Sequence, residues 1–109
     1  MKPHRTVVER GDTYELELNI RVYQDEGYYE YFPVAGDKIS VYVKQNNKVI
    51  TEERLHVYAD MEERVRINVP TQLPAGDYTY DVVISCADGE KHTICDEYIL
   101  KIKEDSTHA

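Results

Sequence analysis

The stretch LPAGDYTYDVVISCADGEKHTICDEYILKIK, Leu73 to Lys103, decides the fold class of this 109-residue chain. Two β-rich runs lie on either side of Asp88-Gly89, a dipeptide that favours a tight hairpin because Gly reaches positive φ without steric cost. Apolar and polar side chains alternate along both runs, which is typical of strands with one buried and one solvated face. The inward positions are expected to be Tyr78, Tyr80, Val82, Ile84 and Cys86 in the first run and Ile94, Tyr98, Leu100 and Ile102 in the second.

The turn before the hairpin carries a second signal. Leu73-Pro74-Ala75-Gly76-Asp77 leads directly into Tyr78, and this arrangement resembles the tyrosine corner of immunoglobulin-like sandwiches. In such a corner the phenol hydroxyl bonds to backbone a few residues upstream. We expect Tyr78 to make the same bond.

The rest of the chain supplies further short strands. Apolar and polar residues alternate without a break from Tyr14 to Val22, which predicts one half-buried strand. Lys38 to Lys44 and Arg64 to Val69 alternate in the same way. About seven such strands, with turn signals roughly every 8 to 12 residues, indicate an all-β protein, and specifically an immunoglobulin-like antiparallel β-sandwich.

A chain of this length is large enough for one hydrophobic core and too short for two. We expect a single domain over residues 6–103, with loose tails at 1–5 and 104–109. No run approaches the ~18 apolar residues that a membrane span needs. Met1 is not followed by the apolar core of a signal peptide, so synthesis in the cytoplasm is expected.

The net charge of −8 limits the kinds of partner. Nucleic-acid binding draws most of its affinity from Lys and Arg side chains that neutralise phosphates. An acidic chain therefore disfavours nucleic acids, and it disfavours anionic membrane surfaces for the same reason. It keeps the domain in solution and is compatible with a basic protein partner.

Cys86 and Cys95 are expected to be free thiols. A tight turn at Asp88-Gly89 sets Cys86 opposite residue 90 or 91 and Cys95 opposite residue 81 or 82. The two sulfurs then lie about four residue steps apart, roughly 13 Å at the usual strand rise. A disulfide needs Cα atoms within about 7 Å of each other.

No pattern in the chain points to catalysis. The four histidines are scattered, neither cysteine has zinc-ligand spacing, and the five glycines are isolated at turns. No serine lies in a nucleophile elbow. We therefore expect no catalytic residues, no metal, no cofactor and no enzymatic activity.

Tyrosine is the distinctive residue, with ten Tyr against one Phe and no Trp. The run Tyr28-Tyr29-Glu30-Tyr31-Phe32 ends at Pro33 and places aromatic side chains on both sides of one strand. Loops that cover both faces would explain it, and so would a contact surface, since Tyr joins a large apolar area to a polar tip. The residues predicted for protein contact are Tyr28, Tyr29, Tyr31 and Phe32. The alternative is a carbohydrate-binding surface that stacks sugars on Tyr28, Tyr29 and Tyr31.

Several segments together resemble a known family. They are GDTYEL at Gly11–Leu16, GDKISVYVK at Gly36–Lys44, VPTQLPAGDYTYDV at Val69–Val82 and ADGE at Ala87–Glu90. This pattern, which extends from about Val7 to Lys103, is similar to the N-terminal immunoglobulin-like domain of phage baseplate upper proteins and related tail and fibre proteins. The aromatic run from Tyr28 departs from that pattern.

The resemblance implies a non-enzymatic phage virion structural or adaptor module. Such domains dock a fibre or receptor-binding part onto the virion, often as a trimer. The implied partners are other virion proteins and copies of the chain itself, and the implied location is the virion, assembled in the host cytoplasm. A bacterial cytosolic domain with a coincidental pattern remains the other alternative.

Overall fold

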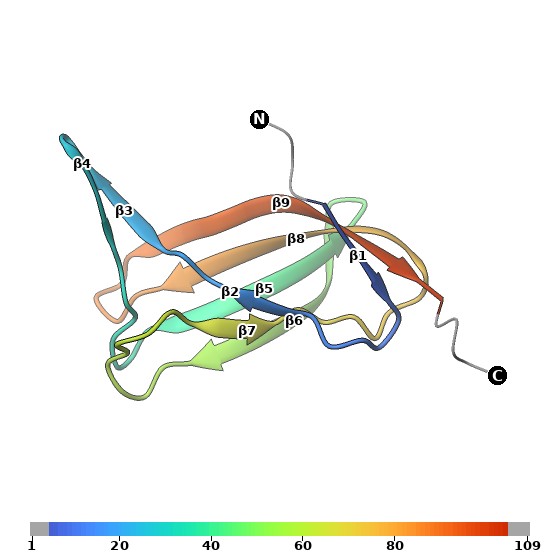
Figure 1. The fold of residues 1–109 in the computed structure, drawn as a ribbon, viewed down its shortest axis with the longest axis horizontal. Coiled ribbons are helices and arrows are strands. Elements are labelled where there is room, and N and C mark those ends of the chain that lie inside the picture. Colours follow the sequence, from blue (N-terminus) through green and yellow to red (C-terminus); the bar gives the residue numbers. More distant parts are fainter. Residues whose placement is uncertain (1–4, 105–109) are drawn as a thin grey trace.

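The computed structural model describes residues 5–104, apart from the side chains of residues 95 and 96. This part of the chain is all β, with nine strands and no helix (Figure 1). The strands are β1 (Arg5–Glu9), β2 (Glu15–Glu17), β3 (Arg21–Gln24), β4 (Gly27–Glu30), β5 (Lys38–Gln45), β6 (Lys48–His56), β7 (Arg66–Asn68), β8 (Gly76–Ser85) and β9 (Lys91–Lys103).

The strands form one large sheet and two small ones. The large sheet has the order β1-β9-β8-β5-β6, while β2 pairs with β7 and β3 pairs with β4. All pairs are antiparallel except β1 with β9, which is parallel. The prediction of an all-β protein is confirmed. The described residues nevertheless contain nine strands rather than about seven, and the large sheet is mixed rather than wholly antiparallel.

The predicted hairpin joins β8 to β9. Ser85 lies opposite Lys91, and the amide of Cys86 donates to the carbonyl of Glu90 at 2.7 Å. Gly89 has φ 97°, the left-handed conformation for which the sequence predicts glycine. The backbone of Cys95 lies opposite Val82, as the register predicted, and Cys86 is a free thiol.

One face of the large sheet carries most of the core. The alternation predicted for β5 and β8 is confirmed, because their inward side chains are buried. The short β2–β7 ribbon and the residues beside it cover this face and complete a two-layer core. The buried cluster comprises Leu18, Ile20, Ile39, Val41, Val43, Val65, Ile67, Val69, Tyr78, Tyr80, Val82, Ile84, Leu100 and Ile102.

The single strand predicted from Tyr14 to Val22 is wrong in one respect. Its alternation holds, but the segment divides into β2 and β3, which pair with different partners. Between them the amide of Leu18 donates to Val65 at 2.8 Å, and the carbonyl of Ile20 accepts from Tyr31 at 2.8 Å. Alternation predicts the face of the sheet to which each side chain points, but it does not predict which strand pairs with the segment.

Strands occupy both ends of the described part of the chain. Arg5, expected in a tail, is the first residue of β1 and pairs with Ile99. Glu104 follows directly after β9. The remainder of the two predicted tails, residues 1–4 and 105–109, lies outside the described residues.

The hydroxyl of Tyr78 donates to the carbonyl of Pro74 at 2.5 Å, as the corner pattern predicted. Replacing Tyr78 by phenylalanine keeps the ring and removes this bond, so we expect the free energy of unfolding to fall by about 1 kcal/mol. Urea unfolding followed by circular dichroism measures the change. Tyr58→Phe is the control, because Tyr58 is 87% exposed; equal midpoints for the two variants would contradict the prediction.

Candidate functional site

The β3–β4 hairpin, residues 21–30, is called the arm. It leaves the two-layer core and projects from one end of the molecule (Figure 1). Its strands pair from Arg21 opposite Glu30 to Gln24 opposite Gly27, around a turn at Asp25-Glu26. Gly27 has φ 139°, which supplies the backbone conformation that closes this turn.

The base of the arm is fixed to the body by an arginine. The Arg64 guanidinium lies 2.6 Å from the Glu30 carboxylate on β4 and 3.7 Å from the Glu17 carboxylate on β2. These ion pairs are partly exposed, so each contributes little to stability. Arg64 thus bridges β4 of the arm and β2 of the body.

One face of the arm is aromatic and exposed. Tyr23 and Tyr28 lie opposite each other, with ring centroids 5.7 Å apart. The guanidinium of Arg21 lies over the Tyr28 ring, 4.6 Å from its centroid, which is the geometry of a cation–π contact. Tyr23 is nevertheless 72% exposed and Tyr28 is 54% exposed. These three residues are called the arm patch.

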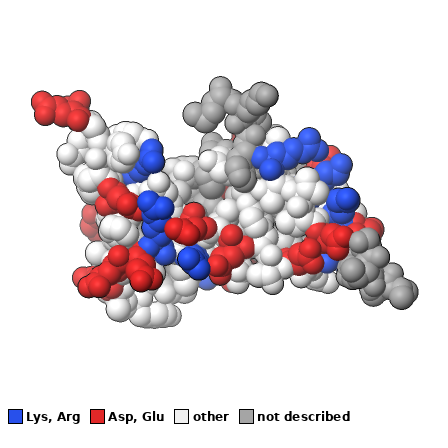
Figure 2. All heavy atoms as spheres, viewed as in Figure 1, with Lys and Arg blue, Asp and Glu red and all other residues white. Residues whose placement is uncertain are grey.

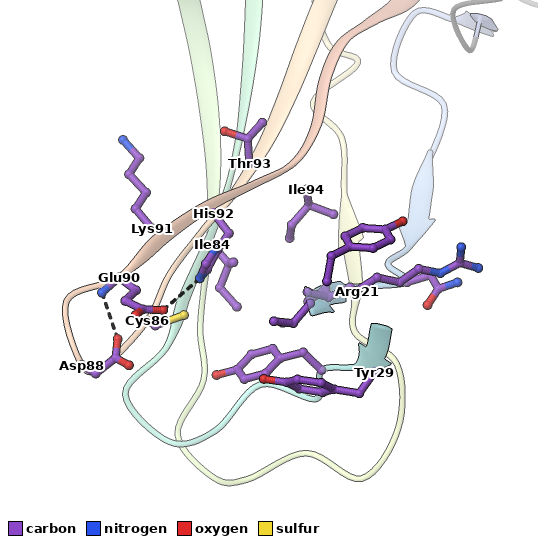
Figure 3. A pocket seen from close by; sticks show the side chains of 15 residues that line it. Arg21, Tyr29, Ile84, Cys86, Asp88, Glu90, Lys91, His92, Thr93 and Ile94 are labelled. Atoms are coloured by element: carbon purple, nitrogen blue, oxygen red, sulfur yellow. Dashed lines mark hydrogen bonds and ion pairs between the residues drawn. The ribbon is translucent and has the colours of Figure 1, made fainter. Parts of the chain in front are cut away.

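Between the arm and the β8–β9 end of the large sheet lies a groove of about 640 Å³, which Arg21 and Tyr23 of the arm patch line together with Tyr29. Tyr29 lies on one side of it, and Ile84, Cys86 and Ile94 of the β8–β9 end lie on the other (Figure 3). Burial raises the pKa of the Cys86 thiol, and the Asp37 charge raises it further. Cys86 is therefore held as a neutral thiol rather than as a nucleophilic thiolate.

Buried Asp37 and half-buried Tyr31 form a hydrogen-bonded pair below the arm. The Tyr31 hydroxyl donates to Asp37 Oδ2 at 2.5 Å, and the amides of Val34 and Ala87 donate to the same carboxylate at 3.0 and 2.9 Å. Burial and the Asp37 carboxylate both raise the pKa of Tyr31 far above its usual value. Burial alone would raise the pKa of Asp37, but the three donors outweigh it and the pKa lies below its usual value.

The four predicted contact residues therefore separate. Tyr28 belongs to the exposed arm patch and Tyr29 to the groove, because consecutive residues of a strand point to opposite faces. Phe32 is partly exposed at the base of the arm. Tyr31 is half-buried and bonded to Asp37, so it supports the structure. The three tyrosines of the sugar-stacking alternative do not share one platform.

Two residues of the arm patch were not among the predicted contacts. Arg21 and Tyr23 precede the aromatic run, and only the hairpin turn brings them beside Tyr28. The polar segment Gln24-Asp25-Glu26-Gly27 is typical of a turn, and pairing across it places Tyr23 opposite Tyr28. Ile84 and Ile94 of the groove had no such signal, because they lie more than fifty residues further along the chain.

Acidic side chains mark the tip of the arm in Figure 2, and below the arm acidic and basic side chains are interspersed. Asp25 and Glu26 form the turn at that tip. Asp88 and Glu90 line the groove, and His92 lies 3.2 Å from Glu90. A partner with a basic surface meets a favourable field here.

Among residues 5–104, the His, Cys, Asp and Glu side chains that the structure describes form no group of three or more that could hold a metal ion. None of these residues belongs to a helix long and apolar enough to cross a membrane.

Fold and site together define an all-β protein with a projecting aromatic hairpin and a groove at its base. Neither family models nor curated proteins show a match to the chain.

Proposed function

We propose that the protein is a non-enzymatic binding module, a phage virion structural or adaptor domain that docks tail, baseplate or fibre parts through protein–protein contacts. The observation that carries this proposal is the arm patch. Tyr23 and Tyr28 contact each other and Arg21 contacts Tyr28, yet both tyrosines present more than half of their surface to solvent. Tyr and Arg are enriched among the residues that dominate binding energy in protein interfaces.

Strand order supports an immunoglobulin-like sandwich as the scaffold. β8 lies between β9 and β5, as strand F lies between G and C, and β6 extends that sheet beyond β5 as strand C′ does in variable-type domains. β2 pairs with β7 in the second layer, as strand B pairs with E. The Tyr78 bond to Pro74 falls at the start of the strand equivalent to F, where the tyrosine corner belongs. The arm then occupies the connection between B and C.

The phage assignment rests on the resemblance of Gly11–Leu16, Gly36–Lys44 and Val69–Glu90 to baseplate upper protein domains. In that family the sandwich docks a larger part onto the virion. An acidic binding module with an exposed aromatic arm suits such a role, since steric and electrostatic fit govern assembly from many copies. The partners are other virion proteins and further copies of the chain.

Replacing both Tyr23 and Tyr28 by serine is expected to weaken docking at least tenfold, because the two rings supply most of the exposed aromatic area of the arm. The unfolding midpoint is expected to stay unchanged, since neither ring belongs to the core. Co-sedimentation of the purified chain with virions from the producing culture measures docking, and sedimentation velocity measures self-association.

Tyr58→Ser is the matched control, because Tyr58 is 87% exposed and lies outside the arm. Absence of the chain from purified virions would overturn the phage assignment. Equal docking by the arm variant and the control would overturn the role of the arm. A shift of tyrosine fluorescence with sugars that the arm variant abolishes would replace protein docking by carbohydrate binding.

A further inference from the structure

β6 is an edge strand of nine residues at the end of the large sheet. β5 pairs with one of its two edges, and within residues 5–104 no strand pairs with the other. In Figure 1 β6 lies along the lower border of the ribbon. The turn and loop hydrogen bonds of the described residues do not involve the backbone of residues 48–56. The open edge therefore presents a row of N–H and C=O groups, which is a template for pairing with another chain.

The side chains of β6 restrict which chain can pair with it. Three consecutive residues in its middle, Glu52, Glu53 and Arg54, are charged and exposed. Charged side chains on an edge reject most incoming strands. A strand that pairs here must bring opposite charges at matching positions, and a second copy of β6 in antiparallel orientation brings them.

Charge also selects the register of such a pair. Residues opposite each other in an antiparallel pair lie on the same face, so two identical strands related by a two-fold axis pair around one residue. An axis at Thr51, Glu52 or Arg54 sets neither glutamate opposite a lysine or an arginine. An axis at Glu53 sets Glu52 of each copy opposite Arg54 of the other.

We propose that two copies of the chain pair through the open edges of β6, antiparallel and centred on Glu53, so that their two large sheets become one continuous sheet. The contact is isologous, because each copy uses the same residues. It goes beyond the proposed function, since β6 lies outside the arm and docking through the arm patch does not require it.

The ion pair already present on β6 extends in the dimer. The Arg54 guanidinium donates to both carboxylate oxygens of Glu52 in the same chain, at 3.1 and 3.0 Å. In the paired strands each Glu52 has its own Arg54 beside it and Arg54 of the second copy opposite it. The four side chains form a ring of alternating charge. A single exposed ion pair contributes little, but a network contributes more.

The ends of β6 fit the same register. The pairing of β6 with β5 shifts between Val49 and Thr51, so the regular part of the strand begins at Thr51. Residues 51–55 of this part are symmetric about Glu53. Antiparallel order then brings Val49 and Ile50, which are exposed at the start of β6, to the His56 end of the second copy. Pairing thus covers exposed apolar area as well as backbone.

Charge reversal tests the pairing, with the dimer dissociation constant of the intact chain measured by sedimentation velocity. Glu52→Arg and Arg54→Glu each set like charges opposite each other and are expected to raise this constant at least tenfold. Glu52→Arg should do so although it lowers the net negative charge. An equimolar mixture of the two variants, and the chain that carries both changes, restore opposite charges and are expected to dimerise. Glu104→Arg is the matched control, because Glu104 is exposed after β9; it is expected to dimerise at least as well as the unchanged chain.

The residue on the axis supplies a second test. Two Glu53 carboxylates oppose each other there, so Glu53→Gln is expected to tighten the dimer. Glu53→Cys is expected to form a disulfide between copies on oxidation, since residues directly opposite have Cα atoms about 4.5–5.5 Å apart. Thr51→Cys is expected to form none, because the two copies of residue 51 lie four residue steps apart, roughly 13 Å. Mass spectrometry of the cross-linked peptides separates these products from disulfides of the native cysteines.

Three results would overturn pairing through β6. They are a chain that stays monomeric up to about 1 mM, a mixture of the reversed variants that dimerises no better than either alone, and cross-linking at residue 51 rather than at 53. The role of the arm is read separately, because Tyr23→Ser with Tyr28→Ser is expected to leave the dimer intact. If that variant prevents dimerisation and Glu52→Arg does not, the copies associate through the arm patch and not through β6.

Discussion

Replacing Asp37 by alanine is expected to lower the free energy of unfolding by about 3 kcal/mol or more, because one buried carboxylate satisfies three donors. Asp37 is only 1% exposed. Its two oxygens accept from the Tyr31 hydroxyl and from the amides of Val34 and Ala87. Each donor left without an acceptor in a buried site costs about 1–3 kcal/mol.

The three donors come from separate parts of the fold. Tyr31 and Val34 lie between the arm and β5, whereas Ala87 lies in the turn between β8 and β9. Asp37 therefore holds the base of the arm against the hairpin at the end of the large sheet. Loss of the carboxylate is expected to loosen the arm as well as to destabilise the core, and NMR relaxation of arm amides would report the first effect.

Urea unfolding of two further variants tests this account. Asp37→Asn retains one acceptor oxygen and is expected to cost less than Asp37→Ala. Asp60→Ala is the matched control, because the Asp60 carboxylate also accepts a backbone amide, that of Ala35 at 3.0 Å, but is exposed. A loss for Asp37→Ala no larger than that for Asp60→Ala would contradict the role assigned to the buried carboxylate.

The stabilisation by Asp37 is expected to depend on pH in one direction. Its folded-state pKa lies below the ordinary value of 3.8, so the folded protein binds this proton less readily than the unfolded chain. The contribution is complete well above pH 4 and is lost as the pH falls through the folded pKa. The stability difference between the unchanged chain and Asp37→Asn should therefore shrink between about pH 5 and pH 2; a difference that grows on acidification would contradict the assignment.

Features that depend on local sequence were predictable. Alternation identified the inward residues of β5 and β8, and Asp88-Gly89 located the hairpin between β8 and β9, because both signals reside in neighbouring residues. Strand partners were not predictable in the same way. The segment from Tyr14 to Val22 alternates throughout, but its backbone changes from β7 to β4 as partner, and only tertiary packing decides where that change falls.

β9 shows a second limit. Its register against β8 shifts twice, near Val82, and Glu97 takes φ 55°, which non-glycine residues rarely adopt. The amide of Glu97 donates to Asp81 Oδ1 at 2.8 Å, and Asp81 Oδ2 lies 2.8 Å from the Lys44 ammonium. The Asp81 side chain on β8 thus stabilises the positive φ of Glu97, which the sequence around residue 97 does not predict.

The candidate site was predictable in part for the same reasons. The aromatic run predicted a contact surface, and Tyr28 and Tyr29 are indeed 54% and 47% exposed. The strand, however, ends at Glu30, three residues before Pro33. The hydrogen bond of Tyr31 to Asp37 was not predictable, because Asp after Gly36 is typical of a solvated turn. In the fold this turn is buried beside Ala87, fifty residues further along the chain, and the Asp37 carboxylate accepts the Ala87 amide.

Replacing Tyr80 by alanine is expected to lower the free energy of unfolding by about 4 kcal/mol, the usual range for removing a large aromatic side chain from a packed core. Tyr80 is 0% exposed at the centre of β8. Its ring makes edge-on contacts with Tyr14 and Tyr98, at centroid separations of 6.4 and 5.7 Å. Such pairs contribute about 0.5–1.5 kcal/mol beyond the burial of their area.

Tyr80→Phe separates the ring from its hydroxyl. The hydroxyls of Tyr80 and Tyr14 lie 3.1 Å apart, and that of Tyr14 lies 3.0 Å from Thr6 Oγ1 on β1. Removing one hydroxyl from this chain of contacts is expected to cost about 1 kcal/mol. A double-mutant cycle of Tyr80→Phe with Tyr14→Phe, followed by urea unfolding, measures the coupling. Equal losses of stability for Tyr80→Phe and Tyr80→Ala would contradict the packing account. In that case the hydrogen-bonded hydroxyls of Thr6, Tyr14 and Tyr80 would stabilise the core more than the buried area of the Tyr80 ring does.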